Sequence, residues 1–361
     1  MNHSLTGIAR LCATLLMLIA ISLAALAAEN LYTVVVPLDS EDPEGRDLAY
    51  RQALDQVLIR VTGSDDELQL EELAEIFSDP DRYLLRYRPV PDDSLEVTFD
   101  GNAIENVLRQ ARRTLWDADR PLTLVWLAVD WGQGEREIVG SDEAQFSGDA
   151  SRTIDRNRLL RERVQQTADR RGIPVAFPLL DTEDLQQVSF SDIWGGFDDR
   201  LLEASRRYSA SSVLVGRIRP ETAQQNRWTF YFGEEQLVWY GEPEEVMNML
   251  ANRLAALFAI PGGAPLESYS LIVDGVDSVV AYGKVQQLMD GIGVIEDFSL
   301  RSVSGSKVEY SVSVYGGIER LSKALELSGV LQMSVMVSND DGGAGRGPLS
   351  DPNELTFDYR P

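Results

Sequence analysis

Residues 198–239 constrain the fold more than any other segment, because they hold a helix pattern, a buried-strand pattern and a hairpin pattern in succession. A helix is predicted over residues 198–208, with its leucines on one side. The run at residues 212–216, Ser-Val-Leu-Val-Gly, is short, β-branched and bounded by turns, which is typical of a central strand buried on both faces. A hairpin is predicted over residues 228–239, where Gly233 can supply the positive φ that a tight turn needs.

Residues 1–27 are predicted to be an export signal rather than part of the fold. Arg10 supplies the positive charge, residues 11–26 are apolar, and the Ala25-Leu26-Ala27 sequence gives a signal peptidase its small residues. We therefore expect cleavage after Ala27 and a periplasmic protein. The alternative is an uncleaved anchor in the inner membrane, because the apolar run approaches the shortest length that spans a bilayer.

Loss of this signal would also remove the chain's single Cys, Cys12, and its single His, His3. The mature chain would then contain no thiol, disulfide or imidazole. This composition excludes Ser-His-Asp and Cys-His catalysis and the usual zinc sites. We accordingly predict no metal and no cofactor, and folding that depends on packed apolar cores.

The strongly acidic composition limits the partners that the chain can bind. It carries 33 basic and 58 acidic residues, a formal net charge of −25. Nucleic acid is disfavoured as a partner because phosphate binding needs the opposite sign. Anionic lipid head groups are disfavoured for the same reason. No stable membrane insertion is expected once the signal is removed.

Hydrophobic periodicity predicts an α+β, multi-domain chain with two α/β sandwich-like modules before a smaller one. After the signal, the predicted parts are an N-terminal α+β domain at 28–130, a linker or long loop at 131–157, a middle α/β domain at 158–260, a small domain at 266–337 and a disordered tail at 338–361. The small domain shows the element order βαββαβ, which is ferredoxin-like. Glycine-rich, aperiodic sequence is the reason for assigning the linker and the tail.

Several motifs together resemble a known family of uncharacterised proteins. They are YTVVVP at 32–37, RQAL at 51–54, VTG at 61–63, SFSDIWGGF at 189–197 and VLVGRI at 213–218. With these motifs the chain resembles domain of unknown function DUF2066, a family of exported Gram-negative proteins, over residues 29–335. The resemblance implies export and no particular activity or site. At the level of fold alone, the helix, Val-rich strand and Trp-bearing hairpin are similar to periplasmic α/β modules of the Tol translocation and curli-secretion systems.

The best candidate binding site consists of Asp192, Trp194, Gly195, Gly196 and Phe197. Two aromatic side chains beside paired glycines can line a shallow groove, in which the carboxylate would fix a polar group of a ligand. The alternative is a tight turn whose Trp and Phe fill the core, and we favour it because buried aromatics usually serve packing.

The function predicted from these features is that of a non-catalytic module that binds or assembles with another envelope protein. The alternative is a carboxylate-dependent hydrolase acting on an envelope polymer, since two facing carboxylates suffice for glycoside hydrolysis. With 58 acidic residues, however, no particular pair is singled out, and the motifs that would fix another mechanism are missing.

Overall fold

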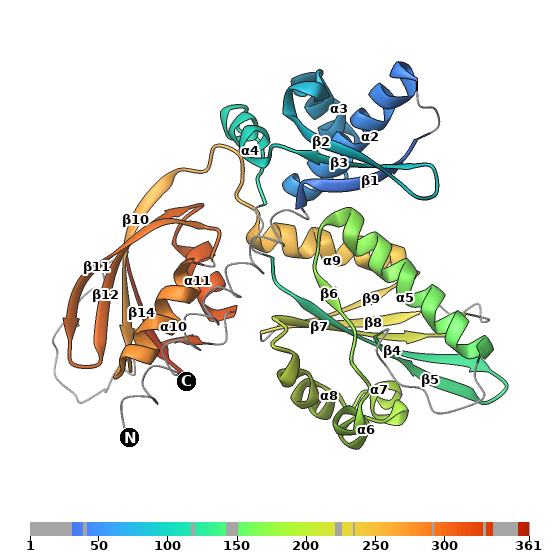
Figure 1. The fold of residues 1–361 in the computed structure, drawn as a ribbon. Helices are drawn as coiled ribbons and strands as arrows, with labels where there is room; N and C mark the ends of the chain where they lie inside the picture. Colours follow the sequence, from blue (N-terminus) through green and yellow to red (C-terminus); the bar gives the residue numbers. More distant parts are fainter. Residues whose placement is uncertain are drawn as a thin grey trace, which may run out of the picture. The chain divides into compact units, whose positions relative to one another are not determined.

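The computed structural model describes residues 31–38, 42–116, 120–141, 151–220, 226–233, 235–290, 292–327, 330–334 and 353–360. The predicted signal peptide lies outside these ranges. Helices and three β-sheets make this an α+β protein (Figure 1). The chain divides into two compact units, residues 1–118 and 119–361. Within the described ranges, no helix is both long and apolar enough to cross a membrane.

The first unit packs helices on one face of a three-stranded antiparallel sheet with the order β1-β3-β2. Its elements are β1 (Thr33–Pro37), α2 (Pro43–Thr62), α3 (Glu67–Ile76), a 3-10 helix (Pro80–Tyr83), β2 (Leu84–Val90), β3 (Ser94–Phe99) and α4 (Gly101–Gln110). Asp42 caps the start of α2 by accepting a hydrogen bond from the Gly45 amide at 2.8 Å. Gly63 ends the helix with φ near 70°, which a residue without a Cβ adopts readily. Val34 pairs with Val97 across the sheet, and both belong to the core beneath α2.

The second unit contains a sheet with the order β5-β4-β7-β8-β9, and β6 pairs with one end of β4. Helices α5 and α9 cover one face, and α6, α7 and α8 cover the other (Figure 1). The elements are β4 (Thr123–Gly132), β5 (Glu135–Val139), α5 (Ser151–Arg171), β6 (Val175–Ala176), α6 (Thr182–Gln187), α7 (Phe190–Gly195), α8 (Asp198–Ser205), a 3-10 helix (Arg206–Tyr208), β7 (Ser212–Ile218), β8 (Arg227–Phe232), β9 (Glu235–Tyr240) and α9 (Pro243–Phe258). The helix, central strand and hairpin predicted from residues 198–239 are confirmed.

Two buried tryptophans, one on each face, fill the core of this sheet. Trp126 donates a hydrogen bond from Nε1 to Ser205 Oγ at 3.0 Å, and Trp228 donates from Nε1 to the Gly241 carbonyl at 3.1 Å. Gly216 on β7 makes room for Trp228, because a Cβ there would lie 2.8 Å from the indole. Burial of both rings is therefore possible without leaving their N–H groups unpaired.

The start of this unit corrects the domain boundaries predicted from the sequence. Strand β4 was assigned to the N-terminal domain at 28–130, but it pairs in parallel with β7. Its near-continuous apolar sequence fits that central position, because both faces of the sheet are covered by helices. Part of the predicted linker at 131–157 is strand β5, and α5 begins within it. Two of the glycines on which the linker prediction rested lie at the β4–β5 turn, with φ of 85° at Gly132 and 88° at Gly134.

The C-terminal part of the second unit contains a five-stranded sheet with α10 and α11 on one face (Figure 1). Its elements are β10 (Leu266–Asp274), α10 (Val279–Asp290), β11 (Ile295–Ser304), β12 (Lys307–Tyr315), α11 (Ile318–Leu327), β13 (Leu331–Met333) and β14 (Glu354–Tyr359). The predicted βαββαβ element order is present from β10 to β13. The strand order is β11-β12-β10-β14-β13, so β14 separates the first and the last strand of that series.

Strand β14 corrects the prediction of a disordered tail at 338–361. It pairs in parallel with β10 and antiparallel with β13. Phe357 is fully buried in the core of this sheet. Burial of its apolar surface offsets the conformational entropy that the strand loses when it becomes ordered. The part of the predicted tail at 338–352 lies outside the described residues.

Candidate functional site

Asp192 acts as a helix cap in α7 rather than as a free carboxylate. Its Oδ2 accepts hydrogen bonds from the Ser189 amide at 2.9 Å and the Ser189 hydroxyl at 2.5 Å, and the Asp192 amide donates to Ser189 Oγ. This reciprocal pattern is a capping box. The Ser189 hydrogen bonds, helped by the positive charge of Arg200, hold the pKa of Asp192 below its usual range. Since Arg200 lies 3.5 Å from Oδ1, both carboxylate oxygens have protein partners.

Gly195 and Gly196 form the turn that follows α7. Gly196 ends the helix with φ of 78°, and a Cβ there would lie 3.1 Å from the Arg217 guanidinium. A Cβ on Gly195 would lie 2.7 Å from the ring of Phe197, so that ring folds back over the turn. Phe197 is nevertheless 62% exposed. The expectation that this ring fills the core is therefore wrong.

The core contact of α7 is made by Ile193, which is fully buried, while Trp194 is only half-buried. The Trp194 ring stacks on Phe190 with centroids 5.1 Å apart and an angle of 18° between the rings. The Arg219 guanidinium lies over the Trp194 ring, 4.7 Å from the ring centroid, and that of Arg136 lies 5.8 Å from the Phe190 centroid. We call these four side chains, Arg136, Phe190, Trp194 and Arg219, the aromatic–arginine stack.

A partly buried polar cluster behind the turn was not predicted from the sequence. Arg217 donates from Nε to the Ile193 carbonyl at 2.8 Å, and its Nη2 lies 3.7 Å from Asp198 Oδ1. Tyr231 donates its hydroxyl hydrogen to Asp198 Oδ2. Burial, reinforced by the Asp198 charge, raises the pKa of Tyr231. The strand periodicity of β7 could have located Arg217, because residues 213, 215 and 217 share one face and Val213 pairs with Tyr231.

The site is locally rich in arginine although the whole chain is acidic. Arg136, Arg200, Arg217 and Arg219 all contact the turn, the stack or the carboxylates beside them. Arginine and aromatic side chains are the types enriched at protein interfaces and their hot spots. The arrangement can thus present a rigid aromatic surface, and its carboxylates, Asp192 and Asp198, are both engaged by hydrogen bonds and arginine.

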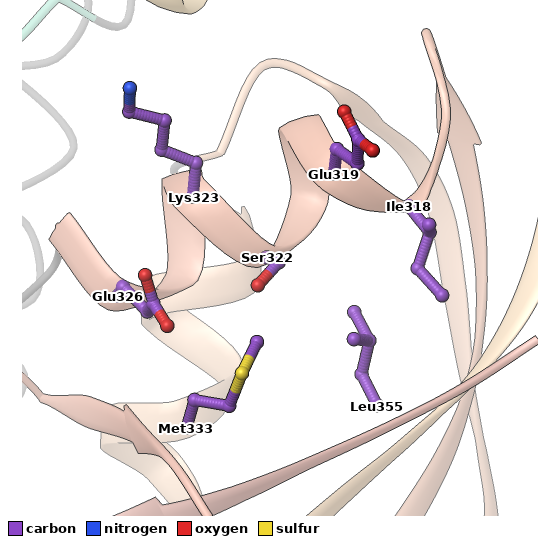
Figure 2. Close-up of a pocket in the computed structure, with 7 residues that line it drawn as sticks. All are labelled: Ile318, Glu319, Ser322, Lys323, Glu326, Met333 and Leu355. Carbon is purple, nitrogen blue, oxygen red and sulfur yellow. The ribbon is translucent and has the colours of Figure 1, made fainter. Parts of the chain in front are cut away.

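A separate hollow of about 430 Å³ lies between α11 and strands β13 and β14. Figure 2 shows Ile318, Met333 and Leu355 converging beneath the helix, with Lys323 pointing away from them. Glu319, Ser322 and Glu326 complete the wall. The hollow shares no residue with the α7 site. In the described ranges, no three or more carboxylate, Cys or His side chains gather where they could hold a metal.

Comparison with known proteins finds one family match, which lies within the first unit. Residues 25–117 match the family described as "Domain of unknown function (DUF8605)". The match covers about a quarter of the chain and ends next to the boundary of the first unit at residue 118. No curated protein and no solved structure matches the chain. The resemblance to DUF2066 inferred from the sequence concerns a different family and stays a prediction.

Proposed function

We propose that the chain is exported to the periplasm and acts there as a non-catalytic module that binds another envelope protein. The observation that carries the proposal is the exposed Phe197 ring on its Gly195–Gly196 turn, beside the aromatic–arginine stack. A multi-domain organisation, with a ferredoxin-like C-terminal module to which β14 adds a strand, suits an assembly role because each module offers its own surface.

The geometry favours binding because Phe197 needs little reorganisation to make a contact. The left-handed Gly196 and the capping box fix the ends of α7, so the ring starts from a defined position. Pre-ordering of this kind reduces the entropy lost on association. Asp192 gives the hydrolase alternative no support, since its carboxylate is committed to Ser189 and Arg200.

A photo-crosslinking amino acid at position 197 tests the proposed interface. We expect a discrete crosslinked product with one envelope protein in intact cells. The matched control places the same amino acid at Leu159, which is 55% exposed on α5 and lies on the opposite face of the same sheet. Equal product patterns at the two positions, or no product at 197, would contradict the proposal.

Export is tested separately by the intact mass of the protein recovered from a periplasmic extract. Because Ala25-Leu26-Ala27 presents the small residues that signal peptidase requires, we expect a chain that starts at Ala28. Replacing Ala27 with a bulky residue should leave the precursor uncleaved. A wild-type mass that still includes residues 1–27 would contradict cleavage.

A further inference from the structure

Most sheet edges in the described part of the chain carry a feature that opposes pairing with another strand. Such features are charge, proline, irregular register, short length and a covering side chain. At β1, the Arg60 guanidinium donates to the outward carbonyls of Leu31 and Thr33, at 3.4 and 2.8 Å. Strand β2 contains Arg86, Arg88 and Pro89, β5 contains Glu135, Arg136 and Glu137, β11 has two register shifts, and β13 spans three residues.

Strand β9 lacks these features. Its only charged residue, Glu235, is paired with Arg253 of α9, and residues 236–240 read Gln-Leu-Val-Trp-Tyr. Its pairing with β8 runs from Phe232↔Glu235 to Arg227↔Tyr240 without a register shift. Among the described strands it pairs with β8 alone. A regular, uncharged edge of this kind is a ready template for an added strand.

The outward hydrogen-bonding groups of β9 can be assigned from the hairpin register. The Gly241 amide donates to the Asn226 carbonyl at 3.2 Å, directly after the Arg227↔Tyr240 pair. In an antiparallel ladder, hydrogen-bonded and non-hydrogen-bonded pairs alternate. The amides of Leu237 and Trp239 therefore point toward β8. Those of Gln236, Val238 and Tyr240 point outward, where a partner strand would lie.

Apolar side chains flank this edge on both faces of the sheet. On one face, Val238 is 40% exposed and Tyr240 is 53% exposed. On the other face, α9 runs beside the strand. Arg253 of α9 pairs with Glu235 at the start of β9, and Glu245 of α9 accepts a hydrogen bond from the Glu242 amide just after β9 ends. Met249 lies between these two contacts in α9 and is 41% exposed. An added strand would thus meet apolar surface on both of its faces.

The charges around β9 indicate which occupant fits. Glu242 and Glu245 are exposed and lie just beyond the C-terminal end of the strand, where Arg163 and Asn226 already contact the Glu242 carboxylate. A second copy of a chain with net charge −25 is electrostatically disfavoured. Building on the proposed function, we propose that β9 binds an extended segment of another protein by strand addition. The segment has alternating apolar side chains and a basic residue beside Glu245.

Amide hydrogen exchange with a synthetic peptide tests this inference on the mature protein. The probe is a short peptide of alternating valine and threonine with a lysine pair at one end. We expect it to slow exchange at Gln236, Val238 and Tyr240 and to leave Leu237 and Trp239 unchanged, since the latter already pair with β8. The same peptide with glutamates in place of lysines should bind about tenfold more weakly, equivalent to about 1.4 kcal/mol.

The variant Val238→Pro removes one outward N–H, and proline is tolerated on edge strands whose N–H faces solvent. It should weaken peptide binding about tenfold or more, whereas the matched Val238→Thr, which keeps the N–H, should bind as wild type. An unchanged melting temperature in both variants shows that the fold is retained. A peptide methylated on alternate backbone nitrogens should not bind, because its pairing donors are blocked.

Three results would overturn the inference. The first is that the lysine peptide gives no alternating protection. The second is that Val238→Pro leaves peptide binding unchanged. The third is that sedimentation shows a dimer that Val238→Pro abolishes, because a second copy would then be the occupant. If one of these results is obtained and the crosslink at position 197 still forms, strand addition at β9 is wrong but the proposed function stands. If instead the peptide binds β9 and position 197 gives no crosslink, the proposed function is wrong but strand addition at β9 stands.

Discussion

Phe357→Ala is expected to lower the free energy of unfolding of the C-terminal part by about 3–5 kcal/mol, the usual range for truncating a buried phenylalanine. The ring is fully buried and belongs to the core beneath α10 and α11. It sits on β14 opposite Val273 of β10 and Met333 of β13, so the cavity would open inside the sheet rather than at its rim. Chemical denaturation followed by circular dichroism measures the loss.

The neighbouring variant Asp358→Ala is the matched control. Asp358 is exposed on the same strand, and surface substitutions usually change stability by about 0.5 kcal/mol or less. Ending the chain before residue 353 should have a larger effect than either substitution, because β13 would lose its pairing partner. A truncated chain that unfolds with the wild-type midpoint would contradict a structural role for β14.

The sequence contains the local hydrophobic pattern of strand β14, but it does not show which strand β14 pairs with. Leu355, Phe357 and Tyr359 alternate with polar residues, which is the period of a half-buried strand. Glycine-rich sequence before the strand led to the prediction of a tail. Parallel pairing with β10 joins residues about eighty positions apart in the chain. Local periodicity carries no information about such a contact, and the same limit explains why β4 was assigned to the wrong domain.

The hairpin and the central strand, by contrast, were predictable because their signals are local. Residues 212–216 are apolar on both faces, and Gly233 lies at the turn between β8 and β9. The alternative prediction of a tight turn at the paired glycines agrees with the structure, in which Gly196 ends α7, but the helix itself was not predicted. The roles of Trp194 and Phe197 were predicted wrongly, because the large size of these side chains was taken to mean that they are buried. In a helix of six residues, the direction of each side chain depends on where the helix begins, and the Ser189 cap sets that position.

Substitutions along α7 separate packing from surface roles, and Ile193→Ala is expected to be the most damaging. Ile193 is fully buried against β4 and β7, so its truncation should lower the free energy of unfolding by about 2–5 kcal/mol. Trp194→Ala should cost less although it removes more atoms, because the ring is half-buried. Its loss is mainly that of the stack on Phe190 and the cation–π contact with Arg219, together about 1–2 kcal/mol.

Phe197→Ala should change the free energy of unfolding by about 0.5 kcal/mol or less, because the ring is already largely in water. Urea denaturation of the three variants in one buffer gives the order directly. If Phe197→Ala proved as destabilising as Ile193→Ala, the ring would be a packing residue and its exposure could not serve binding. If Trp194→Ala exceeded Ile193→Ala, α7 would present its indole to the sheet, and the aromatic–arginine stack would be part of the core. The expected order instead leaves Phe197 free to contact a partner without cost to the fold, which is the condition that a binding surface on this turn requires.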